Sequence, residues 1–136
     1  MSRLYLDANS IIYLVEAVNP FHATVAARLL PYRTDPESRI VTSRLSRLEC
    51  RIQPLRNTDT RLLADYAAFF SMERLIINEV TANVIEQASD LRVRYNFKTP
   101  DAIHLATAIE EKADFFLTGD RTLARCVEVK VEVFAG

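Results

Sequence analysis

The sequence predicts a single α/β domain of three layers, in which helices cover both faces of a mostly parallel sheet. Short apolar runs alternate along the chain with longer segments whose apolar residues recur every three or four positions. The 136 residues are 49% hydrophobic and 26% charged, the balance of one compact domain over residues 1–136. Strands that alternate with helices pair in parallel, and such sheets bind ligands beyond the carboxyl ends of their strands.

The amino-terminal segment is expected to form a strand and two helices. Residues 4–6 are an apolar strand that ends at Asp7, and Asn9 offers an N-cap to the apolar helix that follows. An Asn-Pro pair at 19–20 supplies a cap and a first-turn proline to the next helix, which is expected to end before the loop at 34–36.

The next strand is expected at residues 40–41, and Ser43 then caps a helix. Glu49 falls at one margin of the apolar face of this helix, from which it can reach the edge of the sheet. Arginines at 44, 47 and 51 gather on the other side and are expected to face solvent or a partner chain. The inward face is expected to comprise four apolar residues: Leu45, Leu48, Ile52 and Leu55.

The alternation continues with a helix over residues 57–72 and a strand at 75–77. Two further helices begin at Thr81 and Thr99, and the second carries Asp101 in its first turn, near the positive end of the helix dipole. The inward residues of the first of these helices are expected to be Val84, Ile85, Ala88, Leu91 and Tyr95.

The chain closes with two predicted strands, at residues 115–118 and 127–134. Gly119 is expected to relieve the turn after the first of them, and Asp120 follows directly. Asp114 begins that strand and so lies roughly 20 Å from Asp120, which assigns it a structural or solvated role.

Composition excludes several classes of site. Only two glycines are present, so neither a dinucleotide fingerprint nor a Walker A loop is possible. Cys50 and Cys126 lack metal-ligand spacing and are expected to be buried, reduced thiols, while His22 and His104 are too far apart in sequence to suggest a zinc hydrolase. A net charge of −1 predicts no overall electrostatic attraction to nucleic acid.

No apolar stretch has the roughly 18 residues of a membrane span and the chain opens without a secretory leader, so a cytoplasmic protein is expected.

Four carboxylates carry the functional hypothesis: Asp7, Glu49, Asp101 and Asp120. Each stands at a junction between strand and helix or on a helix that can reach the same edge of a parallel sheet. If they meet, their mutual repulsion raises their pKa values unless a cation neutralises them, and oxygen ligands suit hard divalent ions.

Other polar residues are expected to support these carboxylates. Asn9, Ser46 and Thr118 can hold a carboxylate or a metal-bound water, or else bond to the local backbone. His104 lies about one helical turn after Asp101, where a structural role is favoured over a catalytic one. Four cations are candidates to rim the pocket and bind substrate phosphates: Arg92, Arg94, Lys98 and Arg121.

Four motifs in this order resemble those of the PIN-domain ribonucleases, in particular the VapC-type toxins of prokaryotic toxin–antitoxin pairs. The motifs are LDANS at residues 6–10, SRLSRLE at 43–49, TPDAIHLATA at 99–108 and FLTGD at 116–120. The resemblance covers nearly the whole chain and implies a PIN-like fold. Gly119 is a mild departure, because many relatives carry another small or polar residue there.

The resemblance implies an acidic pocket in which Asp7, Glu49, Asp101 and Asp120 hold Mg²⁺ or Mn²⁺, supported by Asn9 and Thr118. It further implies a homodimer, RNA as the substrate of hydrolysis, and inhibition by a cognate antitoxin whose carboxyl-terminal segment enters or covers the pocket.

Two other functions are compatible with the residues. One is a non-catalytic RNA- or protein-binding adaptor that uses the arginines and apolar surfaces, a reading that the intact acidic set disfavours. The other is a phosphotransferase with Asp7 as an aspartyl nucleophile. The second residue after Asp7 is an asparagine rather than an acid, and no lysine stands near the carboxyl end of a strand, so this function is not expected.

Overall fold

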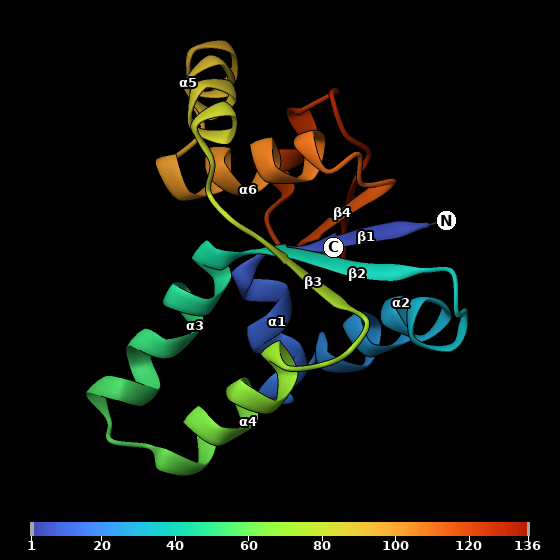
Figure 1. Ribbon diagram of the computed structural model, residues 1–136, viewed down its shortest axis with the longest axis vertical. Coiled ribbons are helices and arrows are strands. Elements are labelled where there is room, and N and C mark those ends of the chain that lie inside the picture. Colours follow the sequence, from blue (N-terminus) through green and yellow to red (C-terminus); the bar gives the residue numbers. More distant parts are fainter. Residues whose placement is uncertain (1, 136) are drawn as a thin grey trace.

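The computed structural model describes residues 2–135, which form a three-layer α/β fold (Figure 1). All strand pairs in its sheet are parallel, in the order β3-β2-β1-β4-β5, so the predicted fold class is confirmed. The strands are β1 (Arg3–Leu6), β2 (Arg39–Ser43), β3 (Leu75–Asn78), β4 (Phe115–Thr118) and β5 (Val131–Val133). The helices are α1 (Ala8–Val15), α2 (His22–Thr34), α3 (Arg44–Arg56), α4 (Thr60–Phe70), α5 (Ala82–Tyr95), α6 (Thr99–Glu110) and the short 3₁₀ helix η1 (Arg121–Arg125).

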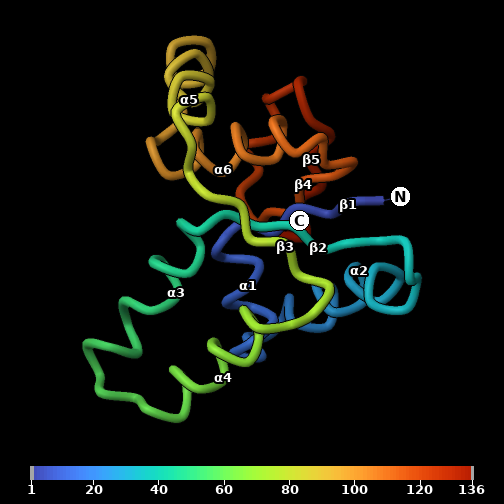
Figure 2. Tube along the Cα trace, viewed as in Figure 1, coloured from blue at the N-terminus to red at the C-terminus, as the bar shows by residue number. Residues whose placement is uncertain are grey.

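Two apolar cores lie on the two faces of the sheet. Helices α1 to α4 cover one face, and α5 and α6 cover the other (Figures 1 and 2). Side chains alternate along β1, so that Leu4 and Leu6 enter the first core and Tyr5 enters the second. The central strand, buried from Leu4 to Leu6, is thus apolar on one side and carries a phenol on the other.

The order of the strands creates a switch point beside β1. From β1 the chain adds β2 and then β3 on one side of the sheet. Helices α5 and α6 then connect β3 to β4, which pairs with β1 on the side opposite β2. A crevice opens beyond the carboxyl ends of the two strands at such a point, and ligands bind there. Asp7 directly follows β1, and Asp120 lies two residues after β4.

Short polar side chains begin most of the helices. Ser43 and Thr81 cap α3 and α5 as expected, since each side chain accepts a backbone N–H of the first turn. The expected cap of α1 was wrong: Asp7, not Asn9, caps this helix by accepting the N–H of Ser10. The helix therefore begins one residue after the strand-end carboxylate, and Asn9 lies in its first turn.

Other boundaries shift by a few residues. Helix α2 begins at His22 rather than at the Asn-Pro pair, and α4 begins later than expected because Asp59 caps it. Helix α6 begins at Thr99 as expected, with Lys98 in its cap position. The last strand, expected over residues 127–134, is only three residues long and begins at Val131. Val127 lies before it and is 84% exposed.

The inward face of α3 differs from the expected one. Leu48, Ile52 and Leu55 are 57%, 40% and 51% exposed, whereas the buried residues of this helix are Ser46, Cys50 and Pro54. The small side chain of Cys50 permits close packing on α1, where its thiol lies 3.9 Å from the carbonyl oxygen of Ala8. These exposed side chains line a groove of about 400 Å³ together with three arginines of the same helix, which were expected on the side away from the apolar face. The arginines are Arg44, Arg47 and Arg51.

Two smaller predictions were also wrong. Ile85 of α5 is 46% exposed rather than inward. Gly119 has no positive φ angle, so the turn does not require glycine. Its benefit is space, because a Cβ atom there would lie 2.9 Å from Cζ of Phe134.

None of the helices within residues 2–135 combines the length and the apolar character that crossing a membrane requires.

Candidate functional site

Asp7 is held on both carboxylate oxygens at the carboxyl edge of β1. Oδ1 accepts the backbone N–H of Ser10 at 2.9 Å and lies 2.8 Å from the Ser10 hydroxyl. Oδ2 accepts the hydroxyl of Thr118 at 2.7 Å. Asp7 is only 6% exposed, and Ser10 and Thr118 are fully buried. The orientation of this carboxylate is therefore set by α1 and β4 together.

Thr118 also connects Asp7 to the segment of Asp120. Its hydroxyl oxygen accepts the backbone N–H of Asp120 at 3.1 Å. Oδ1 of Asp120 accepts the N–H and the hydroxyl of Thr122, at 2.9 and 2.8 Å, and so caps η1. One hydroxyl thus joins both acidic segments.

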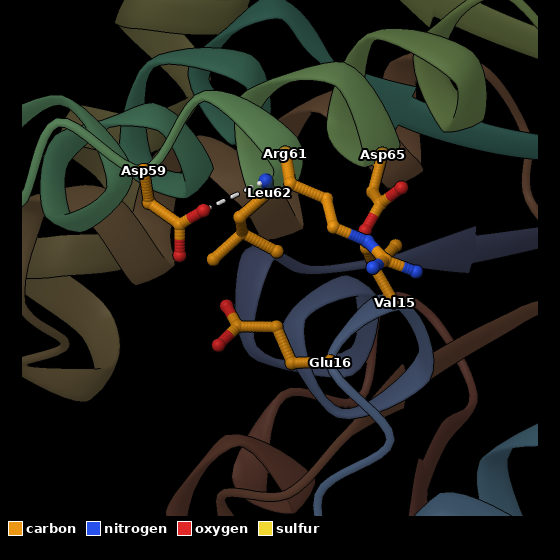
Figure 3. A pocket seen from close by; sticks show the side chains of 6 residues that line it. All are labelled: Val15, Glu16, Asp59, Arg61, Leu62 and Asp65. Carbon is orange, nitrogen blue, oxygen red and sulfur yellow. Dashed lines mark hydrogen bonds between the residues drawn. The ribbon is translucent and has the colours of Figure 1, made fainter.

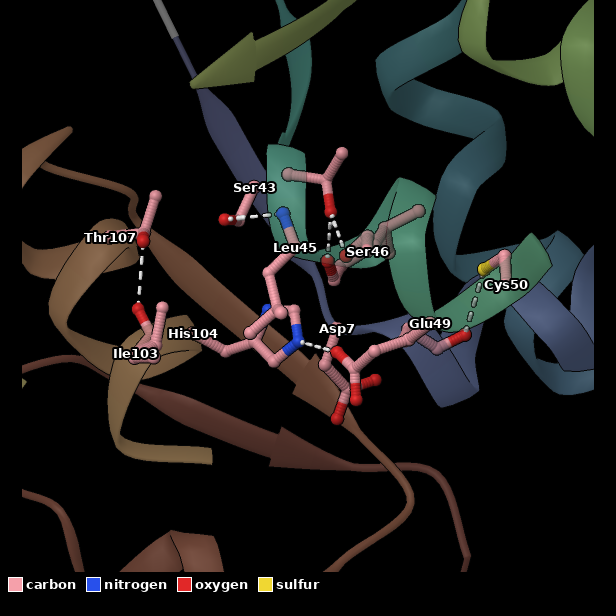
Figure 4. Close-up of polar contacts among 12 residues, drawn as sticks. Asp7, Ser43, Leu45, Ser46, Glu49, Cys50, Ile103, His104 and Thr107 are labelled. Carbon is pink, nitrogen blue, oxygen red and sulfur yellow. Dashed lines mark hydrogen bonds and ion pairs between the residues drawn. The ribbon is translucent and has the colours of Figure 1, made fainter. Parts of the chain in front are cut away.

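Glu49 reaches the same edge from α3. Its Oε1 lies 2.7 Å from Nε2 of His104, whose ring points at the Glu49 carboxylate with Asp7 nearby (Figure 4). Nδ1 of His104 lies 2.7 Å from the hydroxyl of Tyr5. His104 is 3% exposed and Tyr5 is fully buried. Tyr5 was not among the site residues expected from the sequence. The one local sign of a polar role is its hydroxyl, carried between two leucines of an apolar strand.

Asp101 shows that the carboxylates influence one another. Its pKa is raised, first by burial and then by the negative charges of Asp120 and Asp7. His104 acts in the opposite direction, and Glu49 adds a smaller rise to the pKa. These acids come from four separate segments of the chain, so the fold concentrates negative charge at one place.

Three of the four predicted acids line one small pocket. Its volume is about 40 Å³, which suits an ion and a few waters rather than a nucleotide. Asp120 is not in this lining but is joined to it through Thr118 and acts on the pKa of Asp101. The lining residues are Asp7, Ala8, Asn9, Glu49, Asp101 and His104.

The supporting residues expected from the sequence have different surroundings. Thr118 bonds to Asp7, and the exposed Asn9 lines the pocket. Ser46 does not bond to Glu49; its hydroxyl lies 2.7 Å from that of Thr42. Thr42 in turn lies 2.7 Å from the carbonyl oxygen of Leu6, so Ser46 belongs to a buried hydroxyl network that joins β1, β2 and α3.

The donors in the pocket fit a hard divalent cation. As the side chains stand, no three Asp, Glu, His or Cys residues between 2 and 135 form a ready ligand set. The donor atoms are nevertheless carboxylate oxygens, which Mg²⁺ and Mn²⁺ prefer. Within the same residues, Oε2 of Glu49, Oδ2 of Asp120 and both oxygens of Asp101 have no hydrogen bond, so these are the oxygens available to an ion.

The four candidate phosphate-binding cations fall into two groups. Arg92 donates to the carbonyl oxygen of Phe97 and to the hydroxyl of Thr99, so it secures the connection between α5 and α6. Arg94 forms an ion pair with Glu128. Lys98 and Arg121 are exposed, one at the cap of α6 and the other next to Asp120.

A larger pocket of about 320 Å³ lies between α1 and α4 (Figure 3). Two of its three carboxylates already serve the fold. Glu16 accepts the hydroxyl of Tyr66, and Asp59 accepts the N–H of Leu62 at 3.0 Å as the cap of α4. This pocket lies at the joint between two helices, and its lining contains both the third acid, Asp65, and the cation Arg61 (Figure 3).

Both cysteines are free and buried, as expected. Burial, with smaller contributions from Glu49 and Glu16, raises the pKa of Cys50 to about 12. Burial also raises the pKa of Cys126. The reactive thiolate form is therefore disfavoured at both positions.

Comparison with protein families identifies a match to the PIN domain over residues 4–128. No curated protein sequence matches the chain significantly.

Solved structures share the fold at low sequence identity. VapBC2 from Rickettsia felis, bound to a fragment of promoter DNA, matches with a TM-score of 0.79 at 18% identity, over 96% of this chain and 98% of that chain. VapBC from Salmonella typhimurium, bound to DNA, matches with a TM-score of 0.78 at 17% identity, over 98% and 99%. VapC20 from Mycobacterium tuberculosis, described as a sarcin–ricin loop cleaving toxin, matches with a TM-score of 0.70 at 24% identity, over 93% and 98%.

Proposed function

The chain belongs to the PIN-domain family, and from that premise we propose that it is a metal-dependent endoribonuclease, the toxin of a toxin–antitoxin pair that acts in the cytoplasm. The observation that carries this proposal is the convergence of Asp7, Glu49 and Asp101 on one pocket, with Asp120 joined to it through Thr118. The likeness to VapC-containing structures supports the toxin assignment.

Asp7 and Asp101 would hold Mg²⁺ or Mn²⁺ directly, and Glu49 and Asp120 would complete the site directly or through water. The bound ion would lower the pKa of a water and neutralise charge on the scissile phosphate. Asp7 is suited to this role because Ser10 and Thr118 fix its orientation.

In the proposed reaction, water attacks the phosphorus and the bond from phosphorus to the leaving oxygen breaks. Glu49 or Asp120 accepts the proton of the attacking water, since each has a carboxylate oxygen that is not hydrogen-bonded within residues 2–135. Lys98 and Arg121 would contact the phosphates of the RNA, because both are exposed beside acidic residues of the site.

The proposal is tested by cleavage of RNA by the purified protein with Mg²⁺ or Mn²⁺. Asp7→Asn and Asp101→Asn preserve side-chain size and remove ligand charge. We expect each to lower the rate by more than the ~10- to 100-fold loss seen when only a group that supports a ligand is removed.

Asp114→Asn is the matched control, because Asp114 precedes β4 at the opposite end of that strand and accepts the N–H of Arg3. It should cleave like the wild type. Equal rates in all variants would contradict the metal mechanism, and RNA binding without cleavage, insensitive to chelation, would favour an adaptor.

We also propose an antitoxin and a second copy of the chain as protein partners. The structural relatives include toxin–antitoxin complexes, which supports the antitoxin. The exposed Leu48, Ile52 and Leu55 of α3 offer apolar surface to a protein partner. The mass of the purified protein, measured alone and with the product of a neighbouring short reading frame, tests both partners, and a monomer in both samples would contradict them.

A further inference from the structure

A chain of two hydrogen bonds, the first buried and the second partly buried, runs from the sheet to the acidic pocket. It begins at the hydroxyl of Tyr5 on β1, passes through the ring of His104 on α6 and ends at Oε1 of Glu49 on α3 (Figure 4 shows the second bond). Both bonds measure 2.7 Å. The chain therefore joins both layers of helices to the central strand.

The partners of His104 restrict the direction of its two bonds. An ionised carboxylate can only accept, so Nε2 of His104 carries the hydrogen that it donates to Glu49. When the ring is neutral, Nδ1 is then an acceptor and the hydroxyl of Tyr5 donates to it; when the ring is protonated, Nδ1 donates to the hydroxyl oxygen. Burial raises the pKa of Tyr5 well above its usual range, so this phenol keeps its proton. In either state of the ring, Nε2 is the donor to Glu49.

Packing alone does not account for these two polar groups. Tyr5 belongs to the second core, where its ring stacks on Phe116 at 5.0 Å between centroids, and the buried ring of His104 packs edge-on against that of Tyr5. Phenylalanine and leucine would fill the same space without burying a hydroxyl and an imidazole. Each of the two buried groups bonds to the other, and the second nitrogen of His104 bonds to a carboxylate of the pocket.

Glu49 needs such a support more than the other acids do. Asp7 has a short side chain held by Ser10 and Thr118, whereas Glu49 has a longer side chain that is 30% exposed. Its bond to His104 is its only hydrogen bond within residues 2–135. Without this bond the carboxylate is free to rotate away from the pocket, and ordering it costs conformational entropy.

We propose that Tyr5 and His104 are positioning residues that fix Oε1 of Glu49, so that Oε2 remains available to a divalent ion or its bound water. This inference rests on the proposed function, since it assigns the support of one proposed ligand. His104 acts here through Glu49 and does not contact the ion or the RNA.

The test compares His104→Leu, which removes the donor, with His104→Gln, whose amide nitrogen can take the place of Nε2. Binding of Mn²⁺ to the metal-free protein is measured by electron paramagnetic resonance, and kcat and KM for RNA are measured separately. We expect His104→Leu to weaken Mn²⁺ binding and to lower kcat, each by ~10- to 100-fold, with KM for RNA unchanged. His104→Gln should recover most of both losses.

Two further variants distinguish positioning from general loss of structure. Tyr5→Phe removes only the hydroxyl that orients the ring, so it should weaken Mn²⁺ binding in the same direction as His104→Leu but by less. Tyr5→Phe replaces His104→Leu as the test variant if His104→Leu does not fold. In a Glu49→Gln background, His104→Leu should have no further effect on Mn²⁺ binding, because the group that it positions is already changed.

The outcomes separate this inference from the proposed function. If the wild type binds Mn²⁺ and cleaves RNA, and folded His104→Leu and Tyr5→Phe do both equally well, the positioning role is overturned and the function stands. If the wild type neither binds Mn²⁺ nor cleaves RNA, the proposed function fails instead.

Discussion

Replacing Thr118 by valine tests whether a single hydroxyl holds the two acidic segments together. The side chain is fully buried, and valine has nearly the same shape. The substitution removes the donor to Oδ2 of Asp7 and the acceptor of the Asp120 N–H. It leaves the rest of β4 and its pairing with β1 unchanged.

The expected loss follows from these two contacts. A hydrogen bond to a charged group contributes about 1.5–3 kcal/mol and a bond between neutral groups about 0.5–1.5 kcal/mol. Asp120 is exposed, so water can replace part of the second bond. We therefore expect Thr118→Val to lower the free energy of unfolding by about 2–4 kcal/mol.

Urea unfolding in the presence of a chelator measures this loss without any contribution from metal. Thr118→Ser is the matched control, because it keeps the hydroxyl and removes one methyl group, at a cost of about 1 kcal/mol. Equal losses in the two variants, or a valine variant as stable as the wild type, would refute the assigned role of the hydroxyl.

Three other perturbations test separate parts of the account. Because burial and the charge of Asp120 raise the pKa of Asp101, ionisation of Asp101 in the metal-free protein should subtract from the free energy of unfolding as the pH rises above the ordinary Asp value of about 3.9. Asp120→Asn keeps a capping side chain and removes a charge. It should therefore raise the melting temperature measured in chelator at neutral pH and reduce the stabilisation that Mn²⁺ provides. A lower melting temperature in chelator would contradict the repulsion between the acids. The buried thiol of Cys50, with its pKa raised to about 12, should resist iodoacetamide at pH 8 in the folded protein and react after unfolding, as mass spectrometry would show; rapid alkylation of the native protein would exclude this environment. Gly119→Ala should lower the free energy of unfolding in urea by about 1–2 kcal/mol, because its Cβ would lie 2.9 Å from Phe134. Phe134→Leu should partly relieve that loss. An alanine variant as stable as the wild type would count against the close contact.

The architecture and the acidic positions follow from local signals in the sequence. Asp7 directly follows a short apolar strand, and Asp101 lies in a first turn marked by proline. Such signals locate the ends of strands and helices, and parallel pairing then brings these ends to one edge. The convergence of the acids is therefore a consequence of topology that the alternation of strands and helices already implies.

The face of α3 could not be predicted in the same way. Periodicity identifies an apolar stripe, but it does not say which side of a helix meets the rest of the fold. Here Ser46 and Cys50 face inward because small side chains allow close packing, whereas Leu48 and Ile52 remain exposed. The surface left open by this arrangement is visible only in three dimensions.

The partners of the buried polar residues were also beyond sequence reasoning. Tyr5 and His104 are 99 positions apart, and His104 and Glu49 are 55 apart. No spacing rule joins such residues, because their contact depends on how α3 and α6 pack around β1. Similarly, the Thr118 hydroxyl bonds to Asp7 only because β1 and β4 are neighbours in the sheet.

The central claim, that four distant carboxylates form one site for a divalent ion, is tested most directly by the anomalous scattering of Mn²⁺ in crystals of the protein. The account predicts a peak within ~2.0–2.2 Å of oxygens of Asp7 and Asp101, with Glu49 and Asp120 bound directly or through water. The peak should vanish in Asp7→Asn crystals treated in the same way. Saturating Mn²⁺ that gives no peak in the pocket, or a peak held by other residues, would contradict the account.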